Sequence, residues 1–145
     1  MNIETILSAK GSEVRTVRPE TVIAEAVRRM RSERVGALVA SEDGATIVGI
    51  ISDRGIMNAI ADDGIAVMER QVGDVMTKEV FTCQRDDRVA SIMALMTARR
   101  IRHIPVVDGE KRLVGIVSIG DVVKHHLDEI QQEAVSLREY ISAPW

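Results

Sequence analysis

Apolar residues recur at helical spacing twice along the chain, once in each half. The first set is Ile23, Ala26, Val27 and Met30, and the second is Val89, Ile92, Met93 and Met96. Positions i, i+3, i+4 and i+7 fall on one face of an α-helix, so each set predicts an amphipathic helix. Thr21 and Asp87 come just before these segments and belong to residue types that favour the N-cap, so we expect each to cap its helix.

Each predicted helix is followed by two short apolar runs with a glycine-containing turn between them. The runs cover residues 35–40 and 47–51 in the first half, and residues 101–107 and 113–117 in the second. Two such runs around a turn predict a β-hairpin. Further helices are expected to start near Gly55 and Asp121. With a short strand ahead of the first helix, each half is predicted to be β-α-β-β-α.

The two halves are copies of one sequence. Glu13-Val14-Arg15-Thr16-Val17 corresponds to Glu79-Val80-Phe81-Thr82-Cys83, an offset of 66 residues, and the same offset places residues 48–52 on residues 114–118. We therefore predict a first repeat with its lead-in at residues 1–66, a second repeat at 67–127 and a helical extension at 128–145. Because a half of about fifty residues is marginal alone, we expect the repeats to pack together and leave a ligand-sized cleft.

The last predicted helix carries a heptad pattern that its counterpart in the first repeat lacks. Its apolar positions are separated alternately by four and three residues: Val123, Leu127, Ile130, Ala134, Leu137 and Ile141. Such spacing is typical of a coiled-coil seam. Two interpretations stay open, a helix packed on its own domain and a seam for a second chain. Pro144 marks the latest end of the helix.

Composition narrows the class of protein. The 145 residues are 46% hydrophobic and 28% charged with a net charge of −3, which is globular composition without a surface for nucleic acid. The few aromatic residues, Phe81, Tyr140 and Trp145, provide no stacking platform for single strands. Cys83 is the lone cysteine, which favours a reducing compartment. Without a signal peptide or membrane-spanning run, we expect a soluble, cytoplasmic protein with no membrane partner.

The repeated motifs resemble those of a pair of cystathionine β-synthase (CBS) domains, often called a Bateman module. They are VGIISDR at residues 48–54, VMT at 75–77 followed by Val80, IRHIPVVD at 101–108, and LVGIVSIGD at 113–121. The resemblance covers about residues 3–127. It implies an α/β tandem pair with pseudo-twofold symmetry that binds AMP, ADP or ATP, or S-adenosylmethionine or NAD(H). It also implies a regulatory protein that forms a homodimer. We expect this protein to control another protein or the dimer itself, and we expect it not to be an enzyme.

The second repeat contains the more complete candidate site. Asp121 can accept both ribose hydroxyls, and Ser118 with the free amides of the helix start can face a phosphate. The resemblance to CBS domains implies that Ser118 contacts the phosphate and Asp121 contacts the ribose, because these are the usual contacts in that family. Cations near the phosphate are expected from the second repeat and, across the interface, from Arg54. The full predicted set is Asp121, Ser118, Arg102, His103, Ile104, Pro105, Thr82, Val80, Arg54 and Gly120.

The first repeat departs from this pattern. It keeps Thr16, Ser52 and Asp53 as a weaker candidate site, but Gly55 stands at the position of Asp121. Gly36 and Ala37 likewise replace Arg102 and His103, so no charge is present there. We therefore predict one strong site, in the second repeat, and one weak or empty site in the first.

Catalytic and metal sites are not predicted. The chain contains no motif for an activated nucleophile or a phosphate-cradling glycine loop, and its three histidines and Cys83 lack metal-ligand spacing. Cys83 aligns with Val17 and is expected to be a small buried residue. Two alternatives to an adenine-nucleotide sensor remain: an NAD(H) sensor that uses the same cleft, and a dimerisation or adaptor protein with a vestigial pocket.

Overall fold

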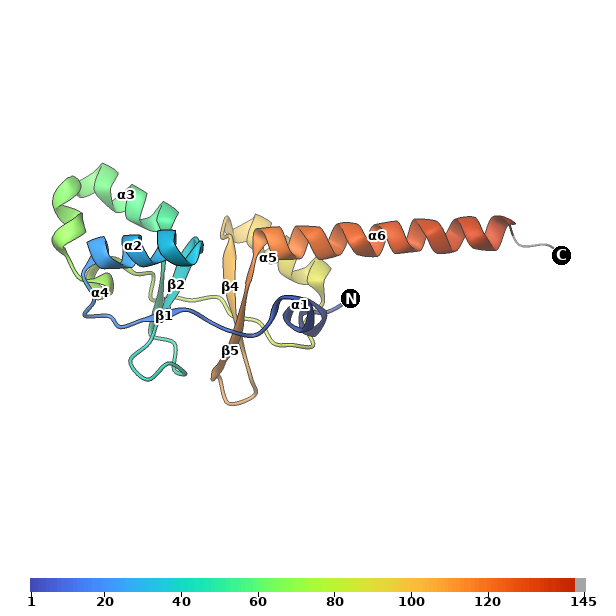
Figure 1. Ribbon diagram of the computed structural model, residues 1–145, viewed down its shortest axis with the longest axis horizontal. Coiled ribbons are helices and arrows are strands. Elements are labelled where there is room, and N and C mark those ends of the chain that lie inside the picture. The colour runs from blue at the N-terminus through green and yellow to red at the C-terminus, as the bar shows by residue number, and fades with distance from the viewer. Residues whose placement is uncertain (143–145) are drawn as a thin grey trace.

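A computed structural model describes residues 1–142 and contains two similar α/β units joined in one elongated molecule (Figure 1). The first unit is built from β1 (Thr16–Val17), α2 (Ile23–Glu33), β2 (Ala37–Ala40), β3 (Gly49–Ser52) and α3 (Asp53–Asp63). The second contains α5 (Val89–Arg99), β4 (His103–Val107), β5 (Leu113–Ser118) and α6 (Ile119–Ser142). The lead-in helices are α1 (Ile3–Lys10) and α4 (Val72–Val75), and the 3-10 helix η1 (Ile65–Glu69) follows α3. The predicted fold class is confirmed.

The offset of 66 residues holds in three dimensions. Helix α5 begins and ends 66 residues after α2. The residues that follow the two helices, Arg34 and Arg100, both adopt the left-handed conformation, with φ of 56° and 54°. In each unit the strands after the helix pair antiparallel, β2 with β3 and β4 with β5. The duplicated sequence therefore folds twice into the same local structure.

The first strand is shorter in the second unit than the sequence predicts. In the first unit β1 pairs parallel with β2 over two residues, and the Val39 amide donates to the Arg15 carbonyl. In the second unit only a single bridge between Cys83 and Val106 remains. Pro105 stands at the position of Val39 and has no N–H to donate, so the second ladder bond cannot form.

The two lead-in helices are exchanged between the units. Ile3, Ile6 and Leu7 of α1 belong to the core of the second unit, together with Cys83, Ile104 and others. Val72 of α4 instead belongs to the core of the first unit. The lead-in that the sequence groups with the first repeat therefore packs on the second. Since each core contains a helix that arrives from across the interface, neither unit buries its apolar residues alone.

Equivalent glycines receive the exchanged segments. A Cβ added at Gly115 would lie 2.8 Å from Leu7 Cδ2, and one at Gly49 would lie 2.5 Å from Met76 Sδ. Both contacts are closer than carbon and sulfur atoms normally approach. The glycine of each V-G-I motif thus leaves room on the strand for the lead-in segment of the other repeat.

The predicted N-caps are wrong. Helices α2 and α5 begin after Val22 and Arg88, and neither has a side-chain cap. Asp87 instead accepts a hydrogen bond from the Gln84 amide. The first helical amides, of Ile23 and Val89, donate to the backbone carbonyls of Arg70 and Met1. The lead-in segments therefore satisfy these helix starts, and side-chain caps are not needed.

Helix α6 extends well beyond the second unit (Figure 1). Its first turns pack against α5, β5 and α1, and Val122 is fully buried. From residue 130 to residue 142 every side chain is exposed. Packing on its own domain therefore explains only the beginning of the helix. None of the described helices is long and apolar enough to cross a membrane.

The contact between Gly115 and Leu7 predicts a coupled effect on stability. Gly115→Ala should lower the free energy of unfolding by about 1–3 kcal/mol, because the new methyl group overpacks the docked helix. Gly109→Ala is the matched control, since a Cβ there meets nothing within 4 Å. Leu7→Ala in the Gly115→Ala background should cost less than in the wild type. Denaturant unfolding measures all four variants, and strictly additive costs would contradict the docking contact.

Candidate functional site

Two pockets lie between the units, and the duplicated sequence lines both with equivalent residues. The Asp121 pocket has a volume of about 480 Å³, and its lining includes Lys10, Arg15, Arg34, His103, Ser118 and Asp121. The Ser52 pocket has a volume of about 190 Å³, and its lining includes Ser52, Gly55, Thr77, Phe81, Arg100 and Arg102. The offset of 66 places Arg34 on Arg100, Ser118 on Ser52 and Asp121 on Gly55. The pockets are therefore two versions of one cleft.

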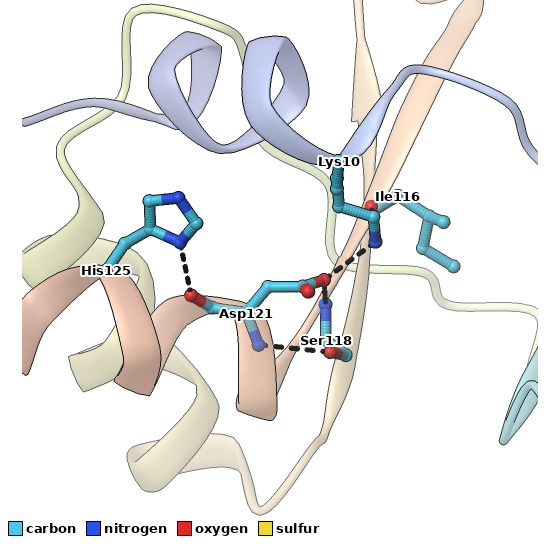
Figure 2. Close-up of polar contacts among 5 residues, drawn as sticks. All are labelled: Lys10, Ile116, Ser118, Asp121 and His125. Atoms are coloured by element: carbon cyan, nitrogen blue, oxygen red, sulfur yellow. Dashed lines mark hydrogen bonds and ion pairs between the residues drawn. The ribbon is translucent and has the colours of Figure 1, made fainter.

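The Asp121 pocket is organised around the first turn of α6 (Figure 2). The Asp121 amide donates to Ser118 Oγ at 3.2 Å, and the Ser118 amide donates to Asp121 Oδ2 at 2.9 Å. This reciprocal pair forms a capping box, which satisfies two backbone donors at the helix start. It also fixes both side chains at the end of β5, where they face the pocket.

Lys10 joins this turn from the exchanged helix α1. Its ammonium group donates to Asp121 Oδ2 at 2.7 Å and to the Ile116 carbonyl at 3.0 Å (Figure 2). Burial alone would raise the pKa of Asp121, but the hydrogen bonds from Lys10 and Ser118 outweigh it and hold the pKa below its usual value. Asp121 is therefore ionised at neutral pH. Its Oδ1 accepts no hydrogen bond from residues 1–142, so one carboxylate oxygen can receive a ligand hydroxyl.

Two arginines of the first unit contribute positive charge to the Asp121 pocket. Arg15 forms an ion pair with Glu13 at 2.6 Å. Arg34 follows α2 in its left-handed C-cap conformation and forms no ion pair within residues 1–142. With Lys10, they place three cationic groups in one cleft with three carboxylates, those of Asp121, Glu13 and Glu33. A molecule with both hydroxyls and phosphates is the complementary ligand.

His103 lies between the two pockets and lines both. Its ring packs over Gly36, where an added Cβ would come within 3.1 Å of Cε1 and Nε2. Burial, and next the positive charge of Arg102, lower the pKa of His103 below 6.5, so the ring is neutral at pH 7. Arg102 itself pairs with Asp53 across the interface at 2.6 Å. Arg102 and Asp53 therefore join the two units.

The Ser52 pocket is smaller and lacks the carboxylate. Ser52 Oγ caps α3 by accepting the Gly55 amide at 3.0 Å, as Ser118 caps α6, but Gly55 has no side chain with which to reciprocate. A bridge between Ile50 and Thr77 closes one side. Phe81 supplies a ring to the lining and stacks under the Arg99 guanidinium at 4.9 Å. This pocket is therefore tighter, and Gly55 stands at the position where Asp121 offers a carboxylate to the other pocket.

The residues predicted for one site are divided between these pockets. Ser118, Asp121 and His103 line the Asp121 pocket, whereas Val80, Arg54, Arg102 and again His103 line the Ser52 pocket. Thr82 lines a separate cavity near Lys78 and Lys111, Ile104 and Pro105 are buried in β4, and Gly120 lies outside both linings. Of the weaker candidates, Ser52 lines the Ser52 pocket, whereas Asp53 pairs with Arg102 and lines a different cavity beside α2 and α3, and Thr16 lies in β1.

Sequence reasoning missed Lys10, Arg15 and Arg34 in the Asp121 pocket and Phe81 in the Ser52 pocket. The repeat offset contained the signal for Arg34, because it aligns with Arg100. The exchange of lead-in helices contained the signal for Lys10, but no sequence pattern reveals that exchange. Each pocket thus combines the strand-to-helix turn of one unit with the lead-in of the other.

Cys83 and the histidines show no sign of a metal site within residues 1–142. No group of three or more His, Cys, Asp and Glu side chains there is arranged to hold an ion. Cys83 is 3% exposed, and burial raises the pKa of its thiol to about 12. The prediction that it is a small buried residue is confirmed.

The chain belongs to the CBS domain family. The sequence model of that family matches it twice, at residues 10–62 and 72–128. A similar protein is the mitochondrial CBS domain-containing protein CBSX3 of Arabidopsis thaliana, 39% identical over 138 residues, which are 92% of this chain and 66% of that protein. The chain therefore spans slightly less than two thirds of this relative.

Solved structures of CBS-domain proteins share the fold. The CBS-domain containing protein ATU1752 of Agrobacterium tumefaciens aligns with a TM-score of 0.83 at 38% identity, covering 87% of this chain and 99% of that one. The CBS domain pair of protein MJ0100 aligns with a TM-score of 0.77 at 26% identity, covering 89% and 98%. That pair was solved in complex with 5′-methylthioadenosine and S-adenosyl-L-methionine. Adenosine-containing ligands therefore bind a CBS pair of this fold.

The environment of His103 predicts a pH dependence of stability. Because the pKa of His103 is lowered in the folded state, the unfolded chain binds more protons than the folded chain once the pH falls below 6.5. The contribution of His103 to the free energy of unfolding is therefore complete above pH 6.5 and is lost as the pH falls to the pKa of the folded state. Each unit of pKa shift accounts for about 1.4 kcal/mol. His103→Gln should flatten this part of the curve of unfolding free energy against pH. Parallel curves for wild type and variant would show that His103 is not perturbed.

Proposed function

We propose that the chain is a regulatory module that binds an adenine nucleotide (AMP, ADP or ATP) in the Asp121 pocket. The observation that carries the proposal is the capping box of Ser118 and Asp121 in a cleft that also contains Lys10, Arg15 and Arg34. In this arrangement Oδ1 of Asp121 accepts a ribose hydroxyl while Lys10 keeps the carboxylate ionised. The Ser118 hydroxyl and the arginines then face the phosphates.

The size of the two pockets supports the choice between them. Pockets for small molecules span about 300–1,000 Å³, a range that includes the Asp121 pocket at about 480 Å³ and excludes the Ser52 pocket at about 190 Å³. The adenosine ligands bound to the CBS pair of MJ0100 support the ligand class. We therefore propose one strong site for each chain, with Ser52 contributing to a weak or empty one.

Regulation follows from the position of the pocket between the units. A ligand that contacts both Arg34 of the first unit and Asp121 of the second favours the arrangement in which these groups are close. We propose that this bias is passed to a separate protein and that the chain itself catalyses no reaction. Its location is proposed to be the cytoplasm, and its working form a homodimer without nucleic acid, membrane or metal.

An NAD(H) sensor is the second candidate, and the shared wall at His103 favours it. Because His103 lines both pockets, a dinucleotide can place its adenosine half in the Asp121 pocket and its second half beside Ser52. The two candidates differ in the residues on which affinity depends. AMP binding requires only the Asp121 pocket, whereas NADH binding requires both pockets.

Matched substitutions at equivalent positions test the site. Asp121→Asn should weaken AMP binding at least about tenfold, because a hydrogen bond to a charged acceptor contributes about 1.5–3 kcal/mol. Ser118→Ala should also weaken it, whereas Ser52→Ala, which removes the corresponding cap of α3, should leave it unchanged. Isothermal titration with AMP, ADP, ATP, NADH and S-adenosylmethionine measures these affinities.

The outcomes of these titrations separate the candidates. If Ser52→Ala abolishes AMP binding and Ser118→Ala does not, AMP binds in the Ser52 pocket and the proposed site is wrong. NADH binding that is tighter than AMP binding and is lost in both serine variants would favour the NAD(H) sensor. No binding of any of these ligands would contradict the sensor and favour an adaptor with a vestigial pocket.

A further inference from the structure

The exposed half of α6 carries an apolar stripe that nothing within residues 1–142 covers. The heptad positions Leu127, Leu137 and Ile141 are 58%, 59% and 73% exposed. The N-terminal amine of Met1 reaches α6 at Glu129, at 3.2 Å, and beyond that point the side chains face solvent. The free part of the helix, residues 130–142, is about 20 Å long.

The exposed half of α6 continues a docked helix, but its apolar face packs on nothing within residues 1–142. Isolated helices shorter than about 12–15 residues are marginal in water, and most helical stability in proteins comes from packing of an apolar face. The stripe follows the alternating spacing of four and three residues that matches one helix against another helix. The stripe therefore matches a long helix with the same heptad spacing. Helix α6 of a second copy is such a helix, because its sequence is the same.

The charges beside the stripe select the direction of pairing. With Leu127, Ala134 and Ile141 at heptad position a, Glu133 falls at position g and Arg138 at position e. In a parallel pair each g residue faces the e residue five positions later on the other helix, so Glu133 of each copy faces Arg138 of the other. Both pairs are attractive.

An antiparallel pair brings like charges together. If Ala134 packs against Ile130 of the second copy, positions e face each other and positions g face each other. Lys124 then meets Arg138 of the second copy, and Glu133 meets Glu133 of the second copy. These contacts are repulsive, so the charge pattern disfavours this arrangement.

We propose that two copies of this chain associate through a parallel, two-stranded coiled coil formed by residues 127–142 of α6. The α/β units of both copies then lie at the same end of the coil, and the first turns of each α6 connect them to it. This association depends on the stripe and on the pair of Glu133 and Arg138, and it does not require a nucleotide.

Sedimentation velocity of the full chain without ligand, from about 1 to 100 μM, tests the association. The wild type should shift from a monomer of 16.0 kDa toward a species of twice that mass. Leu137→Glu should remain monomeric over this concentration range, because it places a charge in the seam of the coiled coil. Leu137 is exposed in the single chain, so the substitution should not disturb the fold. Gln132→Glu adds the same charge on the opposite face and should dimerise like the wild type. Circular dichroism confirms that both variants fold.

Charge reversal tests the direction. In the parallel pair, Glu133→Arg and Arg138→Glu should each weaken the dimer several-fold, and the double variant should restore it. In the antiparallel pair, Arg138→Glu alone would strengthen the dimer through attraction to Lys124. A wild type that stays monomeric, a dimer that persists in Leu137→Glu, or a dimer strengthened by Arg138→Glu would each overturn the proposal.

Discussion

The exchange of lead-in helices is the contact on which the rest of this structure depends. Helix α1 begins the chain but completes the core of the second unit through Ile3, Ile6 and Leu7, and α4 completes the first core through Val72. The strands accept these segments only because Gly49 and Gly115 have no side chains. Separating the two units would expose apolar residues in both cores, so they are expected to fold as one cooperative body.

The same exchange builds the pockets. Each cleft joins the strand-to-helix turn of one unit to the lead-in of the other, so residues of both units line it. Symmetry makes the two clefts similar in lining, but the duplicated sequence has diverged at one decisive position, where Asp121 stands in one copy and Gly55 in the other. One fold thus contains a roomier pocket with Asp121 at its strand-to-helix turn and a tighter one with Gly55 at that position, and His103 is their common wall.

Local patterns in the sequence predicted what local physics determines. The two amphipathic helices, the hairpins, the buried Cys83 and the C-terminal helix all follow from spacing and repetition. The composition of the site did not follow, because the offset of 66 shows which residues are equivalent but not which repeat faces which. Arg102 and Val80 were grouped with Asp121 although they line the Ser52 pocket, and Lys10 was missed. Thr21 and Asp87 failed as N-caps for a related reason, since carbonyls of the exchanged segments receive the helix amides.

The central claim is that the Asp121 pocket, and not its symmetric counterpart, holds an adenine nucleotide. The most direct measurement is a crystal structure of the chain grown with AMP. The account predicts one nucleotide for each chain, with a ribose hydroxyl on the Asp121 carboxylate and the phosphate near Ser118 and Arg34. A nucleotide found in the Ser52 pocket, or outside both pockets, would contradict it.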